Sequence, residues 1–153
     1  PLQMALVMSE AANGGKKYRP YLVKDIIAPD GTVIKHFDPV VERDLNIDPS
    51  VISLVQEGLH EVSTVGTAAA MFKDFPVPIA GKTGTAENSH GRDHGWFVAY
   101  GPFDNPNIAV AVIVENAGYG ATSAVPIGYK ILSAAFGLDK PKTPENQPAP
   151  AQQ

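Results

Sequence analysis

Apolar residues recur at helical spacing in three stretches of the chain: residues 2–13, 49–64 and 123–136. The middle stretch begins at Asp48 and Pro49, and an acidic cap followed by proline is typical of a helix start. Its apolar positions form one stripe made of Val51, Val55, Leu59 and Val62. We predict a helix over each range and expect its apolar stripe to face a core.

The first and last of these helices have stop signals as well as stripes. Asn13-Gly14-Gly15 follows the first helix and Gly137 follows the last, and both sequences are typical of a left-handed helix end. Ser123 is the candidate cap of the last helix. The predicted stripe of the first helix is Leu2, Ala5, Leu6, Ser9 and Ala12. The predicted stripe of the last helix is Ala124, Ile127, Ile131 and Ala135.

The pattern changes from helix to strand after residue 78. Three runs follow that are separated by turn residues: residues 79–87, 95–101 and 108–115. They predict an antiparallel meander of three strands. The last run is apolar at every position from Ala109 to Val114, which favours a strand covered on both faces.

Two shorter runs, residues 21–27 and 32–37, lie between the first two helices. Pro29-Asp30-Gly31 separates them, so a hairpin is expected. The order helix, hairpin, helix, meander, helix predicts an α+β fold in which the last helix lies on the sheet.

Composition restricts the classes of function. The length of 153 residues and the apolar fraction of 44% favour one globular domain, which we place at residues 1–139. Residues 140–153 are rich in proline and glutamine and predict a disordered tail. The net charge of -4, with no basic stripe, argues against a nucleic-acid partner. The chain has no cysteine, so disulfides and thiolate chemistry are excluded.

The segment Gly81-Lys82-Thr83-Gly84-Thr85 is unusual for a strand interior. Glycine weakens strands, so Gly81 and Gly84 indicate close approach of a ligand or another backbone. In a regular strand Thr83 and Thr85 share one face, while Lys82 points to the other. Two hydroxyls beside exposed N–H groups can bind a carboxylate. Edge lysines and strand threonines also occur for structural reasons, so the segment alone leaves both roles open.

Other polar residues are weaker candidates. His90, Asp93 and His94 have the residue types of a metal cluster, but they fall in a predicted loop, where a solvated polar role is favoured. No metal site and no cofactor are therefore predicted. Tyr119 lies in a glycine-rich loop where it could touch substrate, although anchoring of the loop is the favoured role.

The segment from Gly81 to Thr85 resembles the K-T-G-T box of penicillin-binding proteins and serine β-lactamases. Four other segments resemble the same family: residues 1–15, 65–68, 96–100 and 115–126. The resemblance covers about Pro1 to Leu138 and is strongest to the class B, elongation-type transpeptidases. It implies the C-terminal part of a penicillin-binding transpeptidase fold.

The resemblance implies acyl transfer from a peptidoglycan stem peptide, with β-lactams as mimics of the donor. Lys82 would support proton transfer beside the serine of an S-x-N motif. Thr83 and Thr85 would hold the substrate carboxylate, and Gly81 and Gly84 would let the substrate approach. The backbone N–H of Thr85 would be one arm of the oxyanion hole, which makes Lys82 and Thr85 the catalytic candidates.

The chain departs from the family pattern in one respect. No S-x-x-K and no S-x-N motif is present, so the nucleophilic serine is missing. We expect a fragment that is inactive alone and that starts at Pro1 because of a cut inside a larger domain. The alternatives are a non-catalytic stem-peptide-binding or docking module of cell-wall synthesis, or a fragment of a β-lactamase or β-lactam sensor.

The expected partners follow from the same resemblance. They are a stem peptide or β-lactam, and the missing N-terminal half of the transpeptidase domain. The parent protein would be anchored in the membrane and act on its extracytoplasmic face. Since the missing half would supply neighbouring strands, an uncovered sheet edge is expected to favour self-association.

Overall fold

The computed structural model describes residues 1–139, and the predicted tail at residues 140–153 lies outside the described part. Its helices are α1 (Leu2–Ala12), α2 (Pro49–Thr64), α3 (Ala69–Phe72), α4 (Gly120–Ser123) and α5 (Val125–Ala135). Its strands are β1 (Lys16–Tyr18), β2 (Asp25–Ile27), β3 (Val33–His36), β4 (Val41–Asp44), β5 (Ala80–Ala86), β6 (His94–Gly101) and β7 (Ile108–Val114). The predicted α+β class is confirmed.

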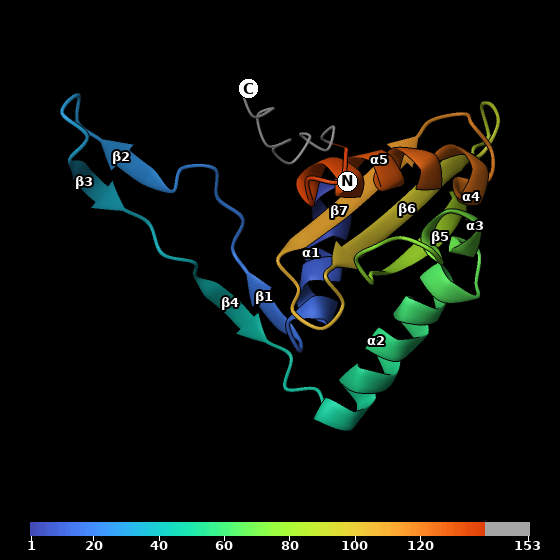
Figure 1. Ribbon diagram of the computed structural model, residues 1–153, viewed down its shortest axis with the longest axis horizontal. Helices are drawn as coiled ribbons and strands as arrows, with labels where there is room; N and C mark the ends of the chain where they lie inside the picture. The colour runs from blue at the N-terminus through green and yellow to red at the C-terminus, as the bar shows by residue number, and fades with distance from the viewer. Residues whose placement is uncertain (140–153) are drawn as a thin grey trace, which may run out of the picture.

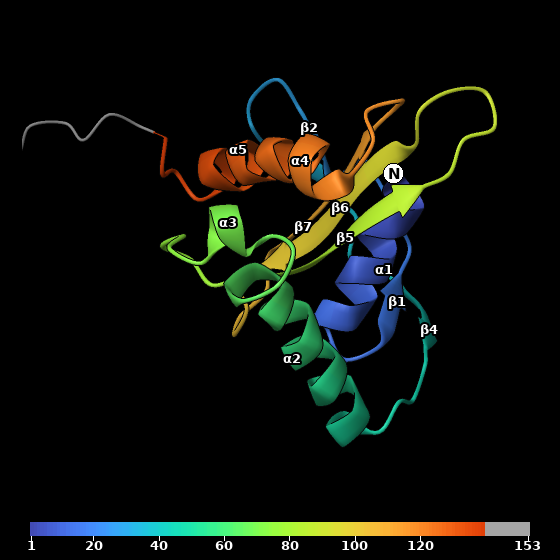
Figure 2. The ribbon, with the colours of Figure 1, turned by 90° about the vertical axis from the view of Figure 1, so that its right-hand side faces the viewer.

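The predicted meander is an antiparallel sheet of order β5-β6-β7 (Figure 1). Helices cover both of its faces, as Figure 2 shows: α1 and α2 lie on one side and α4 and α5 on the other. The apolar run of β7 is thereby covered on both faces, as predicted, and α5 lies on the sheet.

Two apolar cores lie on the two faces of this sheet. Phe97 is fully buried in the larger core, between the sheet and the helices α3 and α5. Met8 of α1 packs with Val98 and Tyr100 in the smaller core on the opposite face. Burial raises the pKa of the Tyr100 phenol, whose hydroxyl has no hydrogen-bond partner among the described residues. The β5-β6-β7 sheet is therefore the central layer, with one apolar core and its helices on each face.

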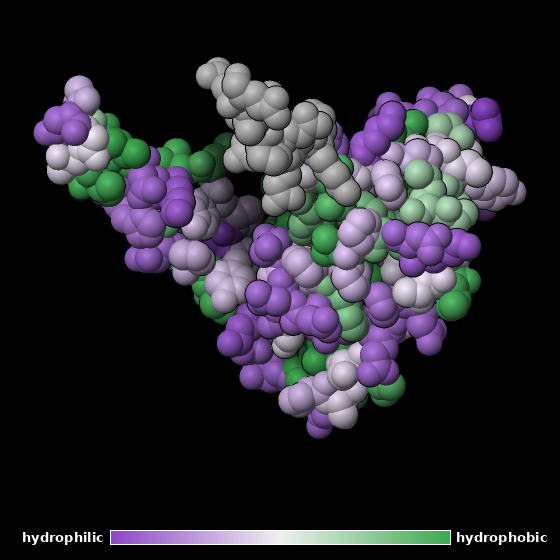
Figure 3. Space-filling view, in the orientation of Figure 1, coloured by the Kyte–Doolittle hydropathy of each residue, from purple (hydrophilic) through white to green (hydrophobic). Residues whose placement is uncertain are grey.

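Two antiparallel ribbons, β1 with β4 and β2 with β3, form an arm that extends away from this body (Figure 1). The predicted hairpin is confirmed by the β2–β3 pair, whereas the β1–β4 pair was not predicted. Apolar side chains gather on the arm (Figure 3), and Leu22 and Ile34 are exposed. An isolated two-stranded ribbon is only marginally stable in water, so the arm contributes little to the core.

The predicted helix at residues 123–136 differs from the structure in its start and in its buried face. The chain forms two helices with a break at Ala124, and Ser123 is the last residue of α4 rather than the cap of α5. Ile127 and Ile131 of the predicted stripe are exposed. The buried residues of α5 are Val125, Gly128, Leu132 and Ser133. A Cβ at Gly128 would overlap the Phe97 ring, so the glycine face of the helix packs on the sheet.

The prediction for α2 is confirmed in its cap and wrong for half of its stripe. The Ser50 N–H donates to Asp48 Oδ1 at 2.8 Å. Val51 and Val55 are exposed, because only the C-terminal half of α2 packs against the sheet. In α1 the buried residue is Met8, which was not in the predicted stripe. Sequence periodicity located these helices but not the side that the rest of the chain covers.

Candidate functional site

The Lys82–Thr85 segment lies on β5, an edge strand of the sheet. Thr83 is paired with Phe97 and Lys82 with Val98, and residues opposite each other on two strands share a face. Thr83 and Thr85 are therefore on the face of α4 and α5, and Lys82 is on the face of α1. This alternation agrees with the prediction from the sequence.

A hollow lies on each side of the β5 edge. The hollow on the α4 side has a volume of about 400 Å³ and is lined by Thr67, Lys82, Thr83, Gly84, Thr85, Tyr119, Gly120 and Ala121. The hollow on the α1 side has a volume of about 310 Å³ and is lined by Met4, Lys82, Thr83, Gly84, Thr85, Ala86, Trp96 and Val98. The first is called the threonine cleft below. Gly81, by contrast, is buried beneath the cleft, where a Cβ would meet Phe97 and the backbone of β6.

Thr67 is a cleft residue to which the sequence analysis assigned no role. Its hydroxyl lies 2.6 Å from the hydroxyl of Thr83, so one of the two donates to the other. Thr67 follows Gly66, where a Cβ would lie 2.8 Å from the Val62 backbone. The available signals were the glycine at this turn after α2 and the resemblance of residues 65–68 to the family. Together with Thr85 the cleft thus has three threonines along one wall.

The wall of the cleft opposite the threonines is the start of α4, which sits directly on the sheet. A Cβ at Gly120 would overlap the backbone oxygens of Gly84 and Trp96. A Cβ at Gly95 would likewise overlap the Ser123 hydroxyl. Two glycines, one on each element, therefore allow α4 to approach the sheet beside Thr83 and Thr85.

The backbone of Thr83 and Thr85 is directed to the open edge. Lys82 Nζ donates to the Thr83 carbonyl at 2.7 Å. The backbone of Gly84, in contrast, faces β6. A Cβ added to Gly120 would lie close to both the Gly84 carbonyl oxygen and the Trp96 nitrogen, and Gly84 and Trp96 are opposite each other in the β5–β6 pair. Because N–H and C=O of one residue point to the same neighbour in an antiparallel pair, outward groups alternate along the strand. By this alternation the N–H of Thr85 points to the open edge.

Helix α2 holds the start of β5. His60 Nδ1 lies 2.7 Å from the Ile79 carbonyl, and Ser63 Oγ donates to the same oxygen at 2.8 Å. Since a carbonyl only accepts, His60 carries its proton on Nδ1. The His60 ring also stacks on Phe103, with ring centroids 4.4 Å apart. These contacts fix the strand before the Lys82–Thr85 segment begins.

The polar loop at residues 87–93 follows the cleft strand. His90 lies 2.9 Å from the Ser89 hydroxyl, and His94 accepts from the Asn116 N–H. Among residues 1–139 no three His, Cys, Asp or Glu side chains are grouped as metal ligands. No helix in that part of the chain is long and apolar enough to cross a membrane.

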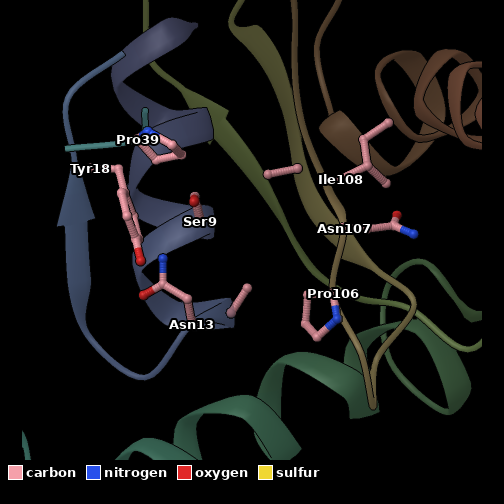
Figure 4. A pocket seen from close by; sticks show the side chains of 9 residues that line it. Ser9, Asn13, Tyr18, Pro39, Pro106, Asn107 and Ile108 are labelled. Carbon is pink, nitrogen blue, oxygen red and sulfur yellow. The ribbon is translucent and has the colours of Figure 1, made fainter. Parts of the chain in front are cut away.

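A separate cavity of about 620 Å³ lies between α1, the β1–β4 ribbon and the turn between β6 and β7 (Figure 4). Tyr18 and Asn13 line one side of it, and Pro106 and Asn107 line the other. Its lining contains no carboxylate, histidine or lysine, so it offers no acid–base or anion-binding chemistry comparable with the cleft.

The sequence matches the family described as penicillin binding protein transpeptidase domain over residues 1–133. It is 34% identical to the peptidoglycan D,D-transpeptidase MrdA of Haemophilus influenzae, over 100% of this chain and 26% of the relative. It is 36% identical to the peptidoglycan D,D-transpeptidase PbpA of Mycolicibacterium smegmatis, over 89% of this chain and 29% of the relative. The chain thus spans between a quarter and a third of the length of these relatives.

Solved structures give the same result. The ceftriaxone acyl-enzyme complex of penicillin-binding protein A from M. tuberculosis matches with a TM-score of 0.76 and 34% identity, over 86% of this chain and 31% of that one. A chain of a peptidoglycan synthase complex matches with a TM-score of 0.77 and 35% identity, over 95% of this chain and 24% of that one. The protein belongs to the penicillin-binding protein transpeptidase domain family, of which it contains a fragment.

Proposed function

We propose that this chain is the part of a peptidoglycan D,D-transpeptidase that carries the K-T-G-T wall of the active site and not the nucleophile. The observation that carries the proposal is the β5 edge, where Thr83 and Thr85 offer their side chains to one cleft and their backbone to an open edge. A strand edge of this kind can pair with an extended peptide, while the threonine hydroxyls bind its carboxylate end.

Each residue of the segment then has a chemical role. The hydroxyls of Thr83 and Thr85 donate hydrogen bonds to the terminal carboxylate of a stem peptide or to the equivalent carboxylate of a β-lactam. Thr67 positions the Thr83 hydroxyl through their contact of 2.6 Å. Lys82 provides a positive charge beside the reacting serine. The Thr85 N–H forms one arm of the oxyanion hole, and such an arm is worth about 3–4 kcal/mol in the transition state.

The nucleophile must come from elsewhere. Neither hollow beside β5 is lined by a serine or cysteine. An oxyanion arm without an activated nucleophile cannot form an acyl-enzyme. The chain alone is therefore inactive, and its partner is the missing half of the domain with the S-x-x-K and S-x-N motifs. Because that reaction uses peptidoglycan, the assembled protein acts on the extracytoplasmic face of the membrane.

Ligand binding tests the carboxylate site directly. We expect the peptide diacetyl-Lys-D-Ala-D-Ala to shift the amide resonances of Thr83 and Thr85 in this chain. Thr83→Val and Thr85→Val keep the side-chain shape but remove a donor to a charged group, so each should weaken binding about 10-fold. Thr32→Val is the matched control, because Thr32 lies in the turn between β2 and β3, away from the cleft. Equal affinities of all three variants would rule out the site.

Covalent labelling tests the missing nucleophile. Fluorescent penicillin should not label this chain alone, and it should label a mixture with an upstream half that contains S-x-x-K. Labelling of the isolated chain would contradict the proposal. Peptide binding without any labelling of the mixture would favour a non-catalytic stem-peptide-binding module instead.

A further inference from the structure

Two loops lie together at the end of β5, next to the threonine cleft. One is the β5–β6 loop at residues 87–93, and the other is the β7–α4 loop at residues 115–119. Asn88 Nδ2 donates to Asn116 Oδ1 at 2.7 Å, and the Gly118 N–H donates to the Asp93 carbonyl at 2.8 Å. Side-chain and backbone hydrogen bonds thus join the loops at two points.

A third link joins the first residue of β6 to the β7–α4 loop, and it depends on protonation. The backbone N–H of Asn116 donates to His94 Nδ1 at 2.9 Å. A backbone N–H can only donate, so Nδ1 carries no proton and His94 is neutral with its proton on Nε2. Protonation of Nδ1 would place two N–H groups against each other. The link exists for the neutral imidazole and is lost for the imidazolium.

Asn116 has a left-handed backbone conformation. Its φ of 54° lies in the left-handed region, which is uncommon for residues other than glycine. Its side-chain oxygen packs so closely on Gly91 that a Cβ there would lie 2.6 Å away. The hydrogen bonds from Asn88 and to His94 therefore hold a residue whose backbone has a cost of its own.

The same loop builds the wall of the cleft. Tyr119 follows Gly118 directly, and Tyr119, Gly120 and Ala121 line the threonine cleft opposite Thr83 and Thr85. Tyr119 is exposed, and its ring has no part in either apolar core. The Gly120 end of this wall rests on the sheet, and the preceding loop leads directly into its Tyr119 end.

We propose that His94 and Asn116 are positioning residues, which hold the Tyr119 wall of the threonine cleft when His94 is neutral and release it when His94 is protonated. The statement that the cleft binds substrate rests on the proposed function. The hydrogen bond between Asn116 and His94, and its loss on protonation, do not depend on that function.

The titratable groups near His94 come from the two loops that adjoin it. The preceding β5–β6 loop contributes Glu87, His90, Arg92 and Asp93, and the β7–α4 loop contributes Glu115 and Tyr119. Among residues 1–139 no ion pair joins His94 to a carboxylate that would fix its charge. His94 is half-buried.

NMR of the whole chain tests the device without any ligand. Ring nitrogen shifts should show the Nε2–H form of His94 at pH 8. Between about pH 8 and pH 5, where histidines commonly titrate, the amides of Asn116, Tyr119 and Gly120 should shift with the same midpoint as the His94 ring. Protection of the Asn116 amide from hydrogen exchange should fall about five-fold over that range, as expected for one lost hydrogen bond.

A non-titrating variant provides the comparison. His94→Asn keeps an acceptor near the Nδ1 position, so the Tyr119 and Gly120 amides should no longer follow pH. His90→Asn is the matched control from the loop before His94 and should leave the pH response unchanged. An Nδ1–H form of wild-type His94 at pH 8, or an unchanged response in the His94→Asn protein, would overturn the proposal. The wild-type tautomer decides the question even where the variant folds poorly. Loss of peptide binding in the threonine variants would leave this result untouched.

Discussion

The two edges of the three-stranded sheet differ in what surrounds them. The β5 edge carries glycines, a lysine and two threonines, and a hollow lies on each side of it. The β7 edge is apolar from Ile108 to Val114, and among residues 1–139 no strand pairs with its outer side. An edge with polar guards and hollows is suited to a ligand, whereas an unguarded apolar edge is suited to another strand.

The difference arises from neighbouring elements more than from the strands themselves. Both strands pair with β6 in regular antiparallel register. Only β5 has α4 seated beside its threonines and Thr67 in contact with Thr83. Displacing α4 should therefore alter the structure of the β5 edge and leave the β7 edge unchanged.

Gly120→Ala is expected to have the largest effect on the β5 edge. The new Cβ would overlap the backbone oxygens of Gly84 and Trp96, which cannot rotate away as a side chain could. We expect a loss of about 3 kcal/mol in the free energy of unfolding, measured by urea denaturation, because overpacking of this kind is costly. Amide shifts should be concentrated at Thr83 to Thr85 and be small in β7.

Gly58→Ala is the matched control for that substitution. Gly58 lies inside α2, and a Cβ there would meet nothing within 4 Å. The alanine should raise the free energy of unfolding by about 0.5–1 kcal/mol, as expected in a helix interior. Equal stability of the two variants would show that α4 does not depend on the glycine contact.

The sequence predicted the strands better than the surfaces that they form. The Lys82–Thr85 segment stood out because glycine is uncommon inside a strand, and its assignment to a site came from its resemblance to the K-T-G-T box. The role of Thr67 was not, because its contact with Thr83 spans 16 positions and depends on the turn at Gly66. Long-range contacts of this kind leave no local periodicity in the sequence.

The helix faces were harder to predict for a related reason. A stripe of apolar residues identifies a helix, but α5 has apolar residues around much of its circumference, and the face is chosen by Gly128 against Phe97. In α2 the stripe continues past the end of the sheet, so Val51 and Val55 have nothing to cover them within the described residues. Periodicity therefore predicts an apolar face and leaves its partner undetermined.

Ile113→Lys tests the second edge. We predict that the wild-type chain self-associates through β7 and that lysine weakens this association on the order of 10-fold or more, since like charges would meet across an edge-to-edge pair. Ile113 is half-buried on the face of Trp96 and lies outside both buried cores, so the substitution should leave the fold intact. Sedimentation equilibrium measures the change.

Thr85→Lys is the matched control, because it adds the same charge to the β5 edge. It should leave the association constant unchanged. A wild-type chain that is monomeric at all concentrations tested, with β7 amides protected from exchange, would contradict the predicted association through this edge.

The smallest expected effect comes from the helix cap that supports the β5 edge at a distance. Helix α2 holds β5 through His60 and Ser63, and Asp48 caps that helix.

Hydrogen bonds from the Ser50 hydroxyl, and then from its backbone N–H, lower the pKa of Asp48 below the usual carboxyl range. Because the pKa is lower in the folded state, the cap stabilises the protein above the ordinary carboxyl pKa of about 3.9 and loses its effect as the pH falls through the folded value. Asp48→Ala should therefore lower the Tm by a few degrees at pH 7, and this deficit should become smaller near pH 2, where Asp48 keeps an acceptor oxygen but not its charge. Asp48→Asn keeps the acceptor without the charge, so its advantage over the alanine variant should persist at both pH values. A deficit of the alanine variant that is the same at pH 7 and pH 2, measured by circular dichroism, would mean that the ionised carboxylate does not support α2 or the strand that it holds.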